Sequence, residues 1–187
     1  MPIFSYTTET LYAECDMSLF ISHYVDVPRF LACCRQCPNY DKKWSCPNFE
    51  FEQLQYWKQF NSIKLFGIKM ILDSSACGLK YEGDLFYFVK SMIAAEKGRL
   101  MQQIWLMEKE IPQSRGLFAG DCQLCARCAK LEGKPCRNPK LMRYSLESIG
   151  GNVQKVTEEL LGTKILWVGK DSTVPEYFTL VSGLLIK

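Results

Sequence analysis

The sequence predicts an α+β fold: a single domain with a small, mostly antiparallel sheet, one long helix and two cysteine-rich segments. The chain has 187 residues, 48% of them hydrophobic and 13% aromatic, which is enough for one domain, residues 1–187, with a real core. Segments with the apolar periods of strands and of helices follow one another irregularly, and several strands fall near the end. This order favours the α+β class.

The first half of the chain is expected to hold two strands and one short helix. Residues 20–25 have strand character, and residues 33–51 are expected to be irregular because two prolines interrupt them. A short helix is expected over residues 51–60 and a strand over residues 63–72. A turn over residues 73–83 then leads to the longest element.

Residues 84–111 are expected to form one long helix that Pro112 ends. Apolar side chains recur at helical spacing, and polar residues occupy the other face. We interpret this stripe as core rather than as a cofactor site. Its members are Ile93, Leu100, Ile104, Met107 and Ile111.

The last third of the chain is expected to hold one helix and two closing strands. Ser145 is placed as an N-cap with Glu147 in the first turn, so that the helix covers residues 145–161. Residues 164–169 and 177–186 are expected to be strands.

Composition excludes several classes of protein. A net charge of +3 gives no indication of nucleic-acid binding, and no apolar run reaches the eighteen residues of a membrane span. Residues 1–10 lack the basic and apolar regions of a secretory signal, so a cytoplasmic location is expected.

The ten cysteines are the unusual feature of the composition. Most of them fall into two short clusters, whereas disulfide frameworks spread cysteines along the chain to close loops. Clustered cysteines in a cytoplasmic chain are typical of metal ligands. The clusters are Cys33, Cys34, Cys37 and the nearby Cys46, and then Cys122, Cys125, Cys128 and Cys136.

The second cluster predicts a [4Fe–4S] cofactor, with zinc as the alternative. Three of its cysteines follow one another at intervals of three, whereas zinc sites usually combine two separated pairs. A tight wrap of this kind can serve three iron corners, and a more distant cysteine can serve the fourth. The predicted ligands are Cys122, Cys125, Cys128 and Cys136.

Basic residues surround this second cluster, with Glu132 as the one acid among them. Cations would offset the negative charge of a thiolate-bound cluster. A solvated basic face is the alternative explanation, and docking of an acidic redox partner is a third. The basic residues are Arg127, Lys130, Lys134, Arg137, Lys140 and Arg143.

The first cluster supplies three ligands, Cys34, Cys37 and Cys46, and Cys33 can replace its neighbour Cys34. Candidates for a fourth ligand elsewhere in the chain are Cys77, Cys15 and His23. Alternatively the site keeps an open position for substrate. A further alternative is that Cys46, which precedes a proline as in two-cluster ferredoxins, completes the second site.

Both segments resemble the signatures of a known family. Residues 34–49 resemble its C-x-x-C-x-x-Y and W-x-C-P-P-F patterns, and residues 122–147 resemble its second signature. The family is that of the cysteine-rich predicted metal-binding proteins of bacteria and archaea, which has no settled reaction. The likeness spans residues 34–161, and Asn48 and Asn138 depart from it at positions that carry no thiolate. It implies a cytoplasmic metal-binding protein.

Three functions therefore compete at the level of sequence. The first is an iron–sulfur protein in electron transfer or redox chemistry with a redox partner protein. The second is an enzyme that uses an open-coordinated cluster on a small-molecule substrate. The third is a zinc-stabilised interaction protein, and a carrier of metal or clusters is a further possibility. One histidine and the absence of a phosphate-loop motif leave no catalytic residue to assign.

Overall fold

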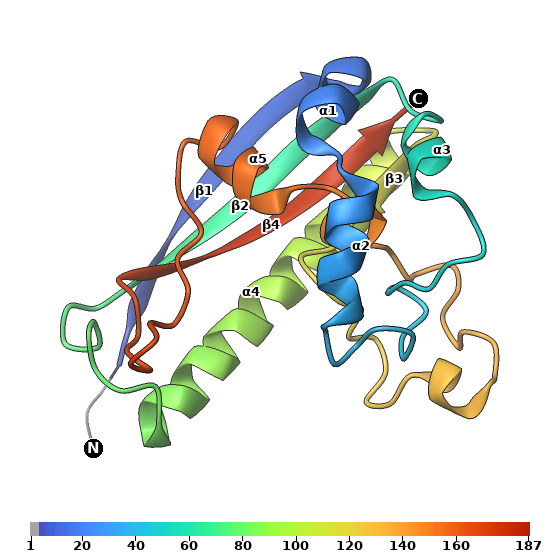
Figure 1. Ribbon diagram of the computed structural model, residues 1–187. Helices are drawn as coiled ribbons and strands as arrows, with labels where there is room; N and C mark the ends of the chain where they lie inside the picture. Colours follow the sequence, from blue (N-terminus) through green and yellow to red (C-terminus); the bar gives the residue numbers. More distant parts are fainter. Residues whose placement is uncertain (1–3) are drawn as a thin grey trace.

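The computed structural model describes residues 4–187 and has a four-stranded antiparallel sheet in the order β1-β2-β4-β3 (Figure 1). The strands are β1 (Tyr6–Asp16), β2 (Ser62–Leu72), β3 (Ser114–Leu117) and β4 (Tyr177–Ile186). β1 and β4 pair with β2 along nearly its whole length, whereas β3 pairs only with the last residues of β4. The predicted α+β class with a mostly antiparallel sheet is confirmed.

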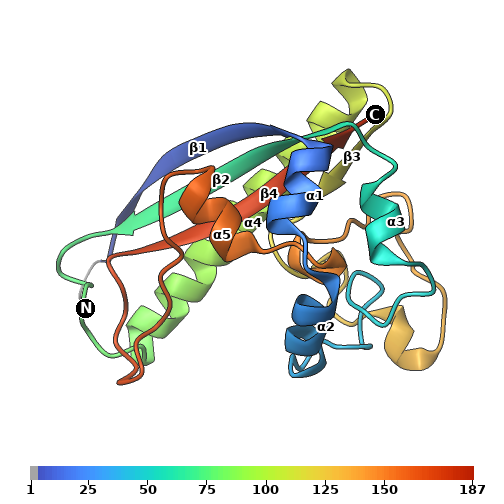
Figure 2. The same cartoon turned by 45° about the horizontal axis from the view of Figure 1, so that its top comes forward.

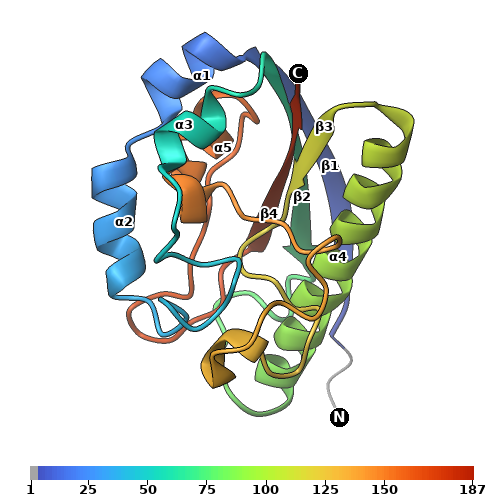
Figure 3. The ribbon, with the colours of Figure 1, turned by 90° about the vertical axis from the view of Figure 1, so that its right-hand side faces the viewer.

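Helices cover both faces of this sheet, as the edge-on view in Figure 3 shows. One long helix, α4 (Gly83–Glu110), lies on one face, and the shorter helices lie on the other. The shorter helices are α1 (Met17–Tyr24), α2 (Val27–Arg35), α3 (Gln53–Trp57) and α5 (Val153–Glu159), with two 3₁₀ turns, η1 (Ala129–Glu132) and η2 (Glu147–Ile149).

The alternation of side chains along β2 explains why both faces are covered. Ile63 and Leu65 are buried in a core cluster that includes side chains of α1, α3 and α5. Ile68 and Met70 point to the opposite face and are buried against side chains of α4. Because successive strand residues point to opposite faces, one continuous apolar strand serves two cores.

The long helix is confirmed. Leu100 and Ile104 are buried, and the other members of the predicted stripe, Ile93, Met107 and Ile111, are partly buried against the same cores. The expected short helix and the strands over 63–72 and 177–186 are also confirmed, as α3, β2 and β4.

The strand expected over residues 20–25 is wrong, because this stretch belongs to α1. Asp16 caps the helix by accepting hydrogen bonds from the amides of Ser18 and Leu19. Phe20 and Tyr24 are buried at a helical interval of four. The first strand, β1, precedes the cap, and its outer residues are largely exposed.

The single helix expected over residues 145–161 is also wrong. The turn η2 ends at Gly150, whose φ of +92° is left-handed, and α5 begins afterwards with Asn152 as its N-cap. Residues 164–169 form no strand. The strand β1 and the short elements α2 and β3 were not predicted. The helix α2 takes in the first cysteines of the segment expected to be irregular. Within the described residues, no helix has both the length and the apolar composition to cross a membrane.

Candidate metal centres

The two cysteine segments lie side by side beyond the β3 edge of the sheet, as Figures 1 and 2 both show. The first follows α2, and the second follows β3 where the chain turns away from β4. The amide of Cys122 donates a hydrogen bond to the hydroxyl of Ser45, with N and O 3.1 Å apart. Lys43 forms an ion pair with Asp121, and Lys130 forms one with Asp41 at 2.9 Å. Segments that are about eighty residues apart in sequence therefore form one joint structure.

The second cysteine set lines one cavity of about 40 Å³. The side-chain amide of Asn138 donates a hydrogen bond to Cys125 Sγ, with the nitrogen and sulfur atoms 3.2 Å apart. Burial raises the pKa of Cys122, and the neighbouring thiols of the set raise it further. The structure therefore brings together all four cysteines predicted as cluster ligands, namely Cys122, Cys125, Cys128 and Cys136.

The first cysteine set lines a separate cavity of about 210 Å³, to which Cys34, Cys37 and Cys46 contribute. Burial, together with the nearby Cys46 and Cys37, raises the pKa of Cys34 to about 11. Cys33 is exposed and does not line the cavity. Consecutive residues of a helix such as α2 point about 100° apart, so only one of the two adjacent cysteines faces inward.

None of the remote candidates for a fourth ligand lies at this cavity. Cys15 and Cys77 donate hydrogen bonds to backbone carbonyls of Asp16 and Asp73, and both pack against the sheet cores. His23 contacts the carbonyl oxygen of Leu19 within its own helix. Cys46 lines the first cavity and not the second. The geometry therefore favours neither a remote fourth cysteine nor an exchange of Cys46 between the two sites.

Two carboxylates line the first cavity in addition to the thiols, and sequence reasoning did not identify either as a site residue. Asp121 lies between Lys43 and Lys97, and these ammonium groups hold the pKa of its carboxyl below the usual value although burial alone would raise it. Burial raises the pKa of Glu147, whose Oε2 atom is buried without a hydrogen-bond partner. For Asp121, the sequence did contain one indication of a place at the site, because this residue directly precedes Cys122.

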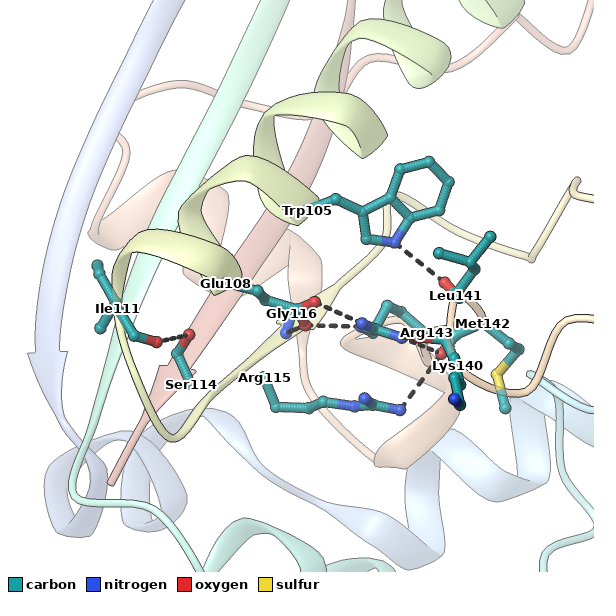
Figure 4. A network of polar contacts seen from close by, with 10 residues as sticks. All are labelled: Trp105, Glu108, Ile111, Ser114, Arg115, Gly116, Lys140, Leu141, Met142 and Arg143. Carbon is teal, nitrogen blue, oxygen red and sulfur yellow. Dashed lines mark hydrogen bonds and ion pairs between the residues drawn. The ribbon is translucent and has the colours of Figure 1, made fainter.

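Most of the basic residues around the second set have structural partners. Arg143 is buried and forms a two-pronged ion pair with Glu108 of α4, as Figure 4 shows. Lys130 forms an ion pair with Asp41 of the first segment, and Lys134 forms one with Glu132 at 3.0 Å. Of the six predicted cations, only Arg137 lines the second cavity, where Lys43 of the first segment joins it. Two of the basic residues, Arg143 and Lys130, thus attach the second segment to the rest of the fold.

The donor chemistry of both cavities suits soft, thiolate-bound metals. All ten cysteines are free thiols, and seven of them line the two cavities. Among residues 4–187, however, no three cysteine, histidine or acidic side chains converge tightly enough to hold a single ion as they stand. The sulfurs line the walls of the cavities instead.

An α+β fold with two cysteine-lined cavities defines a cysteine-rich protein suited to metal binding. The chain belongs to the family of predicted metal-binding proteins (DUF2284), whose family model matches residues 21–186. The resemblance to a family of predicted metal-binding proteins is therefore confirmed, whereas the bacterial and archaeal range expected for that family stays a prediction. Comparison with curated proteins and with solved structures gave no match.

Proposed function

We propose that residues 1–187 form one cytoplasmic metal-binding domain that carries one or two [4Fe–4S] clusters and acts in electron transfer or redox chemistry. The observation that carries this proposal is the sorting of seven cysteines into two adjoining cavities, four in one and three in the other. A reducing cytoplasm keeps such thiols available for metal.

The second cavity is the better candidate for a complete cluster. Its four cysteines would supply one thiolate to each iron corner. The Asn138 amide, which donates to Cys125 Sγ, and the Arg137 guanidinium at the wall would stabilise the negative charge on the sulfurs and raise the reduction potential. A cluster bound there would store and pass single electrons.

The wall between the cavities supports passage of electrons from one centre to the other. Ser45 lines the second cavity, and the adjacent Cys46 lines the first. Likewise, Cys122 lines the second cavity, and the adjacent Asp121 lines the first. The hydrogen bond from Cys122 to Ser45 closes this wall. Two centres would therefore be separated by little more than two paired backbone segments.

A second function, an enzyme that uses an open-coordinated cluster on a small-molecule substrate, is favoured by the composition of the first cavity. It offers three thiols, from Cys34, Cys37 and Cys46, rather than four. A centre with three protein thiolates keeps a position at which another donor or a substrate can bind. The first cavity is thus the place where chemistry on a substrate would occur, and the second would supply electrons to it.

Metal analysis of anaerobically purified protein tests the proposal. We expect iron and acid-labile sulfide in equal amounts, and broad absorption near about 400 nm from thiolate-to-iron charge transfer. Cys125→Ser should lower the iron content, whereas the matched control Cys77→Ser, which alters a cysteine outside both cavities, should not. Colourless protein with stoichiometric zinc would overturn the iron–sulfur proposal in favour of a zinc-stabilised interaction protein.

A further inference from the structure

Glu147 is the acidic side chain of the first cavity whose carboxylate lacks a complete set of partners. Its Oε2 atom is buried and has no hydrogen-bond partner. A buried carboxylate oxygen without a partner costs free energy, so native structures usually supply a donor, a proton or a metal. Glu147 also lies at the same cavity as Cys34, Cys37 and Cys46.

The other carboxylate of the cavity is already occupied. One oxygen of Asp121 binds Lys43, and the other binds Lys97 at 3.3 Å. Lys97, the lysine whose charge acts on Glu147, is thereby paired with Asp121. Among the described residues that line this cavity, Glu147 is thus the acid with a free oxygen atom.

The backbone around Glu147 is fixed to the helix that carries Cys34. The Cys34 thiol donates to the carbonyl oxygen of Glu147, with the sulfur 3.9 Å away. The amide of Asp26, at the start of α2, donates to Gly150 O at 2.9 Å, so that α2 and η2 are joined at both ends. Ser145 and Ser148 exchange hydrogen bonds around the same turn. The backbone that carries Glu147 is therefore held against the helix that carries Cys34.

We propose that the Glu147 carboxylate completes the first metal centre as its oxygen ligand, beside the thiolates of Cys34, Cys37 and Cys46. This inference rests on the proposed function, because it assumes a metal centre in the first cavity. The first cavity has no fourth cysteine, and in this assignment the carboxylate oxygen of Glu147 takes the place of the missing thiolate ligand. A carboxylate is a harder donor than a thiolate, so it binds a soft-ligand centre more weakly and exchanges more readily.

The position of Glu147 also decides from which side a small molecule reaches the centre. Glu147 also lines a third cavity, of about 220 Å³, whose other walls are mainly apolar and include the exposed Trp167. This cavity lies beside the part of β4 that β3 does not cover. A substrate with an apolar body would occupy it and replace the exchangeable carboxylate at the metal.

Substitution of Glu147 in the full chain, loaded anaerobically with iron and sulfide, tests this assignment. The readouts are iron per chain, the electron paramagnetic resonance spectrum of the reduced protein and its midpoint potentials. In Glu147→Ala we expect loss of up to one iron per chain and a changed signal from one cluster only. Glu147→Cys, which offers a thiolate instead, should restore the iron and shift the midpoint potential of that same cluster.

The unchanged signal of the second cluster reports that each variant has folded. Glu176→Gln, which removes an exposed acid outside both cavities, is the matched control and should leave both signals as in the wild type. Wild-type spectra and potentials at both clusters in Glu147→Ala and Glu147→Cys would overturn the assignment of Glu147 and leave the two-cluster proposal intact. A wild-type chain that binds no metal through Cys34, Cys37 and Cys46 would also overturn the assignment of Glu147, and it would reduce the proposed function to its one-cluster form.

Discussion

The backbone amide of Cys122 donates a hydrogen bond to the hydroxyl of Ser45, with the two atoms 3.1 Å apart. Ser45 is 1% exposed, so this hydrogen bond is shielded from bulk water. This bond joins the first cysteine segment to the second at the wall between their cavities. The relative position of the two candidate centres therefore depends in part on a serine that is not among the proposed metal ligands.

Ser45→Ala should destabilise the metal-free, reduced chain by about 1–3 kcal/mol, because it leaves the amide of Cys122 buried without an acceptor. Urea unfolding followed by circular dichroism measures the change. Ser75→Ala is the control, since Ser75 is exposed in a surface turn and should change stability by less than about 0.5 kcal/mol. Equal stabilities of the two variants would contradict the role of Ser45.

The ion pair between Arg143 and Glu108 attaches the second segment to α4, and its loss is expected to lower the stability of the fold strongly. Both side chains are nearly buried, and Arg143 also donates to the carbonyl oxygens of Lys140 and Met142 (Figure 4). Arg143→Met leaves the Glu108 carboxylate buried without its charge partner, so a loss of about 3–5 kcal/mol is expected.

A double-mutant cycle separates the coupling free energy of the ion pair from the free energy lost with the packing of each side chain. Arg143→Met combined with Glu108→Leu should be less destabilising than the sum of the two single changes, because no unpaired charge remains. The more exposed pair of Lys134 and Glu132 provides the comparison, and Lys134→Ala there should cost less than about 1 kcal/mol. Strict additivity of the Arg143 and Glu108 variants would contradict the coupling.

Long periodic stretches could be predicted from the sequence because burial alone determines them. β2, β4 and α4 each run for ten residues or more, and their apolar spacing leaves one choice of element. Residues 20–25 are a short apolar run that suits a strand or a helix equally. The Asp16 cap and the packing of Phe20 decide for the helix, and that packing involves Trp57, far along the chain. β3, at four residues, is too short to carry a period.

The cysteine positions of the candidate site could also be predicted, because their spacing is local. The choice of Cys34 over Cys33 could not, since it depends on the helical phase of α2. The carboxylate of Glu147 could not be foreseen either. The hydrogen bond from the Cys34 thiol to the backbone carbonyl of Glu147 spans 113 residues, and it forms where Gly150 ends η2 and lets α2 pack against the turn.

Gly150 should therefore be intolerant of a side chain. Its φ is +92°, and a Cβ atom there would lie 2.8 Å from the backbone Cα of Val27 in α2. The left-handed backbone alone costs a non-glycine residue about 1–3 kcal/mol, and the clash adds to this in Gly150→Ala. Thermal or urea unfolding measures the loss. Gly98→Ala is the matched control, because Gly98 lies in α4 with open space around it and should gain about 1 kcal/mol in helix propensity. A stabilised Gly150→Ala would contradict this packing.

The two adjacent cysteines of α2 should differ sharply in reactivity in the metal-free, reduced chain. The pKa of Cys34 is about 11, so at pH 8 only about one thousandth of its thiol is the nucleophilic thiolate. Cys33 is exposed to solvent. Iodoacetamide at pH 8 should therefore label Cys33 well before Cys34, and raising the pH to 10 should accelerate labelling of Cys34 about 100-fold. Peptide mass spectrometry of timed samples locates each label, and Cys33→Ser serves as the control in which the remaining α2 label must lie on Cys34. Equal rates at the two positions, or a Cys34 rate that does not rise with pH, would show that Cys34 does not face the buried cavity.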